Sequence, residues 1–165
     1  MSFHETFSAK SVVVNYSGVD LSQGRPEDAF LTISQGAPRA NFRKGVDGNT
    51  SASLSADNSV TVTLSLFPES NAAKVLTGIY YGLKLSHDQG TPVLGALPLG
   101  IADPSGTIFL VAQEAVLVNM GDLSLGEDTG TLDFEFYVED AIAAPLTGEI
   151  ATKLAGALST LGVSV

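Results

Sequence analysis

Residues 59–66, with the sequence SVTVTLSL, constrain the fold of this chain more than any other stretch. Every second residue is apolar, and the residues between them are Ser or Thr. A period of two is typical of a β-strand with one face in the core and the other toward water or a partner. Pro68 ends the strand because it cannot donate to a β-ladder. The chain therefore contains a half-buried strand with a hydroxyl-rich outer face.

A helix is predicted directly after this strand, over about residues 69–85. Ser70 or Asn71 can cap its N-terminus. Its apolar stripe consists of residues at three- and four-residue spacing, namely Ala72, Val75, Leu76, Ile79, Tyr80 and Leu83. The spacing of apolar residues also indicates a short amphipathic helix over about residues 148–161, although Gly156 disfavours it.

The remaining pattern is that of a β-protein. Strands are predicted at residues 11–16, 28–34, 107–119 and 131–138, with an edge strand or bulge in 93–103 because of Pro98 and Gly100. Glu114 interrupts the apolar run 107–119, so a bulge or a projecting strand end is expected there. The prediction is a single domain over residues 1–165, mainly β, with seven to nine strands. It is a β-barrel or sandwich with one flanking α-helix and a projecting β-hairpin.

The projecting hairpin is predicted over about residues 37–56, around the turn GVDGN at 45–49. Its arms carry only Phe42, Val46 and Leu54 as large apolar residues. A hairpin with so little to bury cannot form a core of its own, so we expect it to offer its edges to a neighbour.

Several turns and strands occur in an order and spacing that resemble the tail tube proteins of contractile-tailed, myovirus-type bacteriophages. The resemblance extends over most of residues 10–140. The segments that carry it are GVDG at 45–48, the strand region 57–66, PESN at 68–71 leading into Val75 and Leu76, DPSG at 103–106, and the strand 130–138.

The resemblance implies six copies in a ring, with rings stacked head-to-tail into a tube that channels DNA inside a contractile sheath. The implied partners are the chain itself, the tail sheath protein, and baseplate and tail-terminator proteins. DNA would pass without tight binding, and the protein would be part of the virion tail, assembled in the host cytoplasm. Two alternatives remain: a type VI or contractile-injection tube subunit passing protein cargo, and a monomeric β-sandwich binding or adhesin module.

Charge is unevenly distributed along the chain. Residues 1–84 hold seven acids and seven Lys or Arg, whereas residues 85–165 hold eleven acids and one Lys, which gives the net charge of −10. Such a surface repels phosphate, which disfavours tight nucleic-acid binding. The acids expected to face a lumen or a neighbouring ring are Asp122, Glu127, Asp128, Asp133 and Glu135. The residues expected at contacts between subunits or rings are Arg39, Phe42, Arg43, Lys44 and Asp47.

No catalytic or metal-binding pattern accompanies these features. Cysteine is absent, and neither His4 nor His87 has a His or Cys neighbour at metal-ligand spacing. Nucleophile-elbow and phosphate-loop motifs are also missing. We therefore expect no enzyme, no catalytic residue, no metal and no cofactor. The N-terminal sequence lacks signal-peptide features, and the longest apolar run, 93–102, is broken by Gly95, Pro98 and Gly100, so no membrane insertion is expected.

Overall fold

The alternating segment forms strand β6 (Val60–Leu66), whose side chains are alternately buried and half-buried. The computed structural model describes residues 9–27, 30–90, 94–103, 108–127, 130–139 and 141–142. Within them the chain is mainly β, with one α-helix, one short 3-10 helix and ten strands. The predicted fold class is confirmed. The predicted helix at 148–161 lies outside the described residues.

Eight strands form one antiparallel sheet in the order β2-β1-β7-β8-β9-β6-β3, with β10 paired to β8. The other two strands, β4 and β5, form a separate hairpin. The remaining bounds are β1 (Val13–Tyr16), β2 (Val19–Asp20), β3 (Leu31–Gln35), β4 (Ala40–Lys44), β5 (Thr50–Leu54), β7 (Leu97–Ala102), β8 (Ile108–Met120), β9 (Leu132–Val138) and β10 (Ala141–Ile142).

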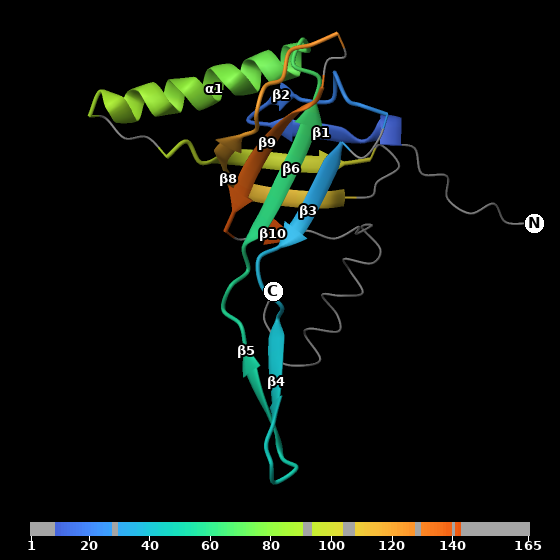
Figure 1. Ribbon diagram of the computed structural model, residues 1–165, viewed down its shortest axis with the longest axis vertical. Coiled ribbons are helices and arrows are strands. Elements are labelled where there is room, and N and C mark those ends of the chain that lie inside the picture. The colour runs from blue at the N-terminus through green and yellow to red at the C-terminus, as the bar shows by residue number, and fades with distance from the viewer. Residues whose placement is uncertain are drawn as a thin grey trace, which may run out of the picture.

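The large sheet folds over on itself, so that β3, β6 and β9 cross over β1 and β7 (Figure 1). Strand β8 makes this possible because it is 13 residues long and pairs with β7 along its first half and with β9 along its second. Bulges interrupt both pairings, and bulges let a strand bend from one layer into the next. The result is a sandwich whose layers meet at a shared strand.

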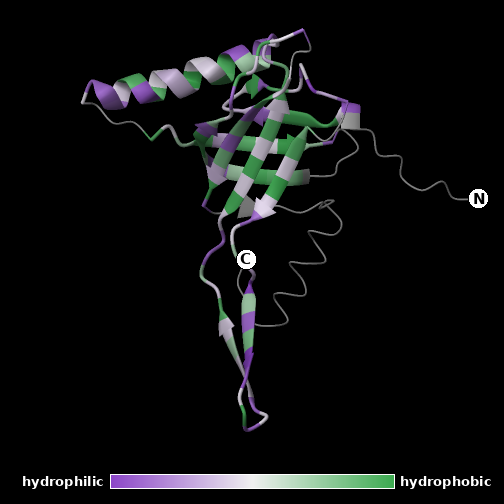
Figure 2. Cartoon of the chain, in the orientation of Figure 1, coloured by the Kyte–Doolittle hydropathy of each residue, from purple (hydrophilic) through white to green (hydrophobic). Residues whose placement is uncertain are grey.

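The core lies between the two layers. Along β6 and β9 the hydrophobic and hydrophilic residues alternate in the pattern that Figure 2 shows by colour. Tyr16 and Phe136 meet edge to face, with ring centroids 5.0 Å apart. The Tyr16 hydroxyl donates to the carbonyl oxygen of Ala115 at 3.1 Å, which satisfies its polar atom inside the core. Burial raises the pKa of Tyr16, so this hydroxyl stays protonated and remains a donor.

Helix α1 (Asn71–Asp88) packs across one end of the sandwich and extends past it (Figure 1). The Ser70 hydroxyl accepts a hydrogen bond from the amide of Ala73 at 3.2 Å, as the predicted N-cap requires. Ala72, Ala73 and Leu76 are buried in the first two turns. Val75, predicted on the buried stripe, is 40% exposed. No helix in the described residues is both long and apolar enough to span a membrane.

The helix extends beyond its predicted end at about residue 85. Helix α1 continues to Asp88, and the chain turns at Gly90, whose φ of +81° favours glycine. Of the edge strand or bulge predicted in 93–103, the bulge is present, but β7 is an interior strand because it pairs with both β1 and β8. A register shift between Leu97 and Leu99 leaves Pro98 out of the ladder, which explains how an interior strand tolerates a proline.

Candidate functional site

Strands β3, β6, β9 and the second half of β8 form a four-stranded layer with a polar outer surface. In β3, β6 and β9 the outer residues alternate with those that face the core. We call the outer set the threonine face: Thr32, Ser34, Thr61, Thr63, Ser65, Val116, Asn119, Asp133, Glu135 and Tyr137. It contains two carboxylates and no Lys or Arg. The Ser65 hydroxyl donates to the Asp133 carboxylate at 2.5 Å, across the β6–β9 pairing. The face is therefore hydroxyl-rich and weakly acidic.

Both sides of this layer end in strand edges that lack a partner within the described residues. On one side, β3 pairs with no described strand except β6. The amide of Ser65 donates to the carbonyl of Phe30, and that of Gly36 to the carbonyl of Ser59. Because hydrogen-bonded and non-hydrogen-bonded pairs alternate in an antiparallel ladder, the backbone groups of Leu31, Ile33 and Gln35 point away from β6. On the other side, residues 116–120 of β8 pair only with β9 among the described strands.

The hairpin β4–β5 continues the β3–β6 pair beyond the sandwich, away from α1 (Figure 1). Its register puts Ala40, Phe42, Ala52 and Leu54 on one face, which we call the apolar hairpin face, with the Lys44–Thr50 pair on the same side at the far end. Phe42 is 70% exposed and Leu54 72% exposed. The opposite face carries the polar pairs Asn41–Ser53 and Arg43–Ser51. An isolated two-stranded hairpin is marginally stable in water, so its apolar face calls for a partner.

The tip and the base of the hairpin are shaped by aspartates. At the tip, Asp47 accepts hydrogen bonds from the amide and the side chain of Asn49, at 3.2 and 2.7 Å. At the base, Asp57 accepts from the Ser59 amide at 2.9 Å. Hydrogen bonds from the Ser59 side chain and amide lower the pKa of Asp57, so this carboxylate is charged at neutral pH. Asp47 therefore has a turn-forming role in addition to its predicted place at the contact surface.

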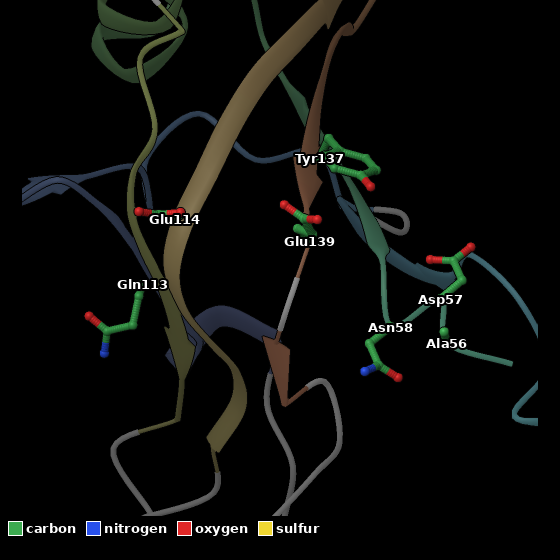
Figure 3. Close-up of a pocket in the computed structure, with 7 residues that line it drawn as sticks. All are labelled: Ala56, Asp57, Asn58, Gln113, Glu114, Tyr137 and Glu139. Carbon is green, nitrogen blue, oxygen red and sulfur yellow. The ribbon is translucent and has the colours of Figure 1, made fainter.

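A hollow of about 590 Å³ lies beside the base of the hairpin. We call it the carboxylate hollow because Asp57, Glu114 and Glu139 line it, together with Ala56, Asn58, Gln113 and Tyr137 (Figure 3). A bulge in β8 creates it: one residue of β7 between Leu97 and Leu99 faces two of β8 between Ala112 and Ala115, and both of those β8 side chains are exposed. The bulge predicted at Glu114 is confirmed.

A second concavity, of about 580 Å³, lies between α1 and the segment after β8. Its lining mixes Lys74, Lys84, Tyr80 and Tyr81 of α1 with Met120, Leu123 and further residues. Asp122 lies here, beside the helix, and not on the threonine face.

The structure thus divides the predicted acids. Asp133 and Glu135 share the threonine face, Asp122 lines the concavity beside α1, and Glu127 is exposed in the loop after β8. Asp128 lies outside the described residues. Of the predicted contact residues, Phe42, Arg43, Lys44 and Asp47 are exposed on the hairpin, and Arg39 is exposed just before it. Among the described residues, no group of three or more His, Cys, Asp or Glu could hold a metal ion.

The sequence analysis did not predict the carboxylate hollow. Its acids come from the hairpin base, from β8 and from the end of β9, and only the pairing of β8 with both neighbours brings them together. One signal was available, namely the single charged residue, Glu114, in a long apolar run.

The fold resembles two solved structures. One is the cap that terminates the tube of the anti-feeding prophage, with a TM-score of 0.54 and 12% identity, covering 88% of this chain and 95% of that one. The other is the sheath/tube terminator of the PVC extracellular contractile injection system in the extended state, with a TM-score of 0.50 and 12% identity, covering 86% and 98%. No protein-family model and no curated protein matches the sequence. The chain therefore has the fold of these contractile-injection tail proteins.

Proposed function

We propose that this protein is a structural subunit of a phage tail tube, in which copies close into six-membered rings that stack into a hollow tube. The observation that carries the proposal is the four-stranded layer with two open edges and a polar outer face. An open edge recruits another strand, and an edge with no cover is a template for association. When the same two edges meet in every copy, the contact is head-to-tail and can close into a ring.

The strand directions support this closure. Neighbouring strands in the layer β3-β6-β9-β8 are antiparallel, so the two edge strands run in opposite directions. The β8 edge of one copy can therefore pair antiparallel with the β3 edge of the next. Repeated around a ring, this pairing makes one closed barrel, which removes every open edge of the layer.

The threonine face lines the channel in this arrangement. Its only charged residues are Asp133 and Glu135, so the wall carries negative charge and no cation that would hold phosphate. The cargo that such a wall suits best is DNA in transit. A tube passing protein cargo shares this architecture and remains the alternative for the cargo. The tail sheath, baseplate and tail-terminator proteins are the expected partners.

A second candidate function is a terminating ring at the end of a tube. It is favoured by one observation, that the two similar solved structures are a tube-terminating cap and a sheath/tube terminator. A tube subunit must bind its own rings on both faces, whereas a terminator forms one ring only.

Electron microscopy of the purified protein tests the proposal, together with size-exclusion chromatography at several concentrations. We expect rings or hollow tubes. Tubes of many rings support the tube subunit, and single rings support the terminator. A stable monomer at high concentration, with and without a tail baseplate as a seed, contradicts both and favours a monomeric binding module.

Reversal of the channel charge tests the cargo. In an Asp133→Lys, Glu135→Lys variant, assembly should continue, because both side chains lie on the outer face and not at a strand edge. Phosphate would then bind to the wall, and DNA delivery should fall by about tenfold or more. Infectivity of particles complemented with the variant measures the effect. Normal delivery by the variant particles would contradict the position of these acids in the channel.

A further inference from the structure

The hairpin β4–β5 extends from a sandwich that gives it no support. Every residue of 41–54 is exposed, including Arg43 and Lys44, which lie at the end of β4 farthest from the sandwich. Its net charge is positive, because Arg39, Arg43 and Lys44 are opposed only by Asp47 within residues 37–56. The hairpin thus carries cations at its far end on both faces, with Lys44 on the side of the apolar hairpin face and Arg43 on the opposite side.

The carboxylate hollow has the opposite character. Asp57, Glu114 and Glu139 line it, and no Lys or Arg of the described part of the chain does. None of the three carboxylates forms an ion pair with a described residue. The ring of Tyr137, which is 42% exposed, lines the same hollow. Carboxylates beside an aromatic ring suit a guanidinium group, which pairs with the former and stacks on the latter.

The cations of the hairpin cannot reach the carboxylate hollow of their own chain. That hairpin leaves the sandwich beside the hollow and runs away from it, so Arg43 and Lys44 lie at its far end (Figure 1). A second copy, in contrast, offers the same cations on a projecting arm. Two different surfaces of the same chain then meet, which is the head-to-tail type of contact that builds rings and stacks.

We propose that the hairpin of one copy docks on the next copy, with Arg43 and Lys44 against the carboxylate hollow formed by Asp57, Glu114 and Glu139. This inference rests on the proposed function, since it requires assembly, but it names a contact distinct from the strand edges. Complementary charges fix the register of such a contact and disfavour a wrong one.

Exchanging the charges tests the contact. The Arg43→Glu, Lys44→Glu variant and the Glu114→Lys, Glu139→Lys variant should each lose assembly by about tenfold or more, because like charges then face each other. An equimolar mixture of the two variants should regain it, since each hairpin then finds a hollow of opposite charge. A Glu69→Lys, Asp88→Lys variant changes the net charge by the same amount as the Glu114→Lys, Glu139→Lys variant, but at the two ends of α1, and should assemble normally.

Disulfide trapping provides a second readout that needs no charge change. The chain has no native cysteine, so an Arg43→Cys, Glu114→Cys variant can form only engineered bonds. We expect a ladder of covalent oligomers on a non-reducing gel and no ladder from either single variant, because the bond requires Cα atoms within about 7 Å.

If both charge variants assemble normally, or if the mixture does not restore assembly, the proposed contact is wrong. The proposed function would still stand in that case, provided that the wild-type protein forms rings. Absence of wild-type rings would overturn both.

Discussion

A Gln35→Pro variant should fold like the wild-type protein and fail to form rings. Gln35 is exposed at the end of β3, and the alternation of the β3–β6 ladder points its N–H away from β6. Proline removes that N–H and adds a ring at the open edge, while the bonds to β6 remain. Edge pairing between copies then loses a donor and meets a steric obstacle. Circular dichroism and urea unfolding report the fold, and electron microscopy reports the rings.

Two control variants distinguish the loss of an N–H at the open edge of β3 from the loss of a hydrogen bond between β3 and β6. Gln35→Ala keeps the N–H and should assemble normally. Ser34→Pro removes an N–H that points toward β6, so it should lower the stability of the monomer itself. Rings formed by Gln35→Pro at the wild-type yield would exclude the β3 edge from the interface.

Replacing Phe134 with Ala should lower the free energy of unfolding by about 3–5 kcal/mol, as for other large-to-small changes at fully buried aromatic residues. Phe134 is 0% exposed in β9, between the two layers of the sandwich. The change leaves a cavity that the crossed layers cannot close without moving a paired strand. Urea unfolding of the monomer measures the effect.

Phe42→Ala is the matched control, since it is the same chemical change at a residue 70% exposed on the hairpin. The stability of the monomer should change by no more than about 0.5 kcal/mol, as is usual for surface positions. Assembly should weaken instead, because the apolar hairpin face loses its largest side chain. A loss of monomer stability as large as that of Phe134→Ala would mean that the hairpin packs on its own sandwich.

The parts of the fold that follow from local chemistry could be predicted. The strict alternation in residues 59–66 gave β6, and the spacing of apolar residues after Pro68 gave α1 with its Ser70 cap. Residues 37–56 contain few large apolar residues, which indicated a hairpin without a core of its own. The structure has the hairpin β4–β5 in this segment. In each case the pattern reflects which side of one element is buried.

The parts that depend on pairing between distant segments could not be predicted. Proline in 93–103 pointed to an edge strand or a bulge and could not decide between them; β7 lies between β1 and β8, with a bulge that leaves Pro98 out of the β7–β8 ladder. The carboxylate hollow needs β8, β9 and the hairpin base at once. The exposure of Val75 follows from how α1 crosses the sandwich end, which its own periodicity does not determine.

The lack of a core beneath the hairpin has a kinetic consequence for the proposed tube. A two-stranded element of marginal stability is fully ordered only when something holds it, so the first contact between free copies must offset the entropy of fixing both arms. A copy that binds to an existing ring finds the docking surfaces of that ring already formed. The contacts with the ring then offset the entropy cost of ordering its hairpin in the same step. Nucleation would therefore be slow and elongation fast. Free subunits would remain unpolymerised at concentrations that sustain growth, and a preformed seed would decide where each tube begins.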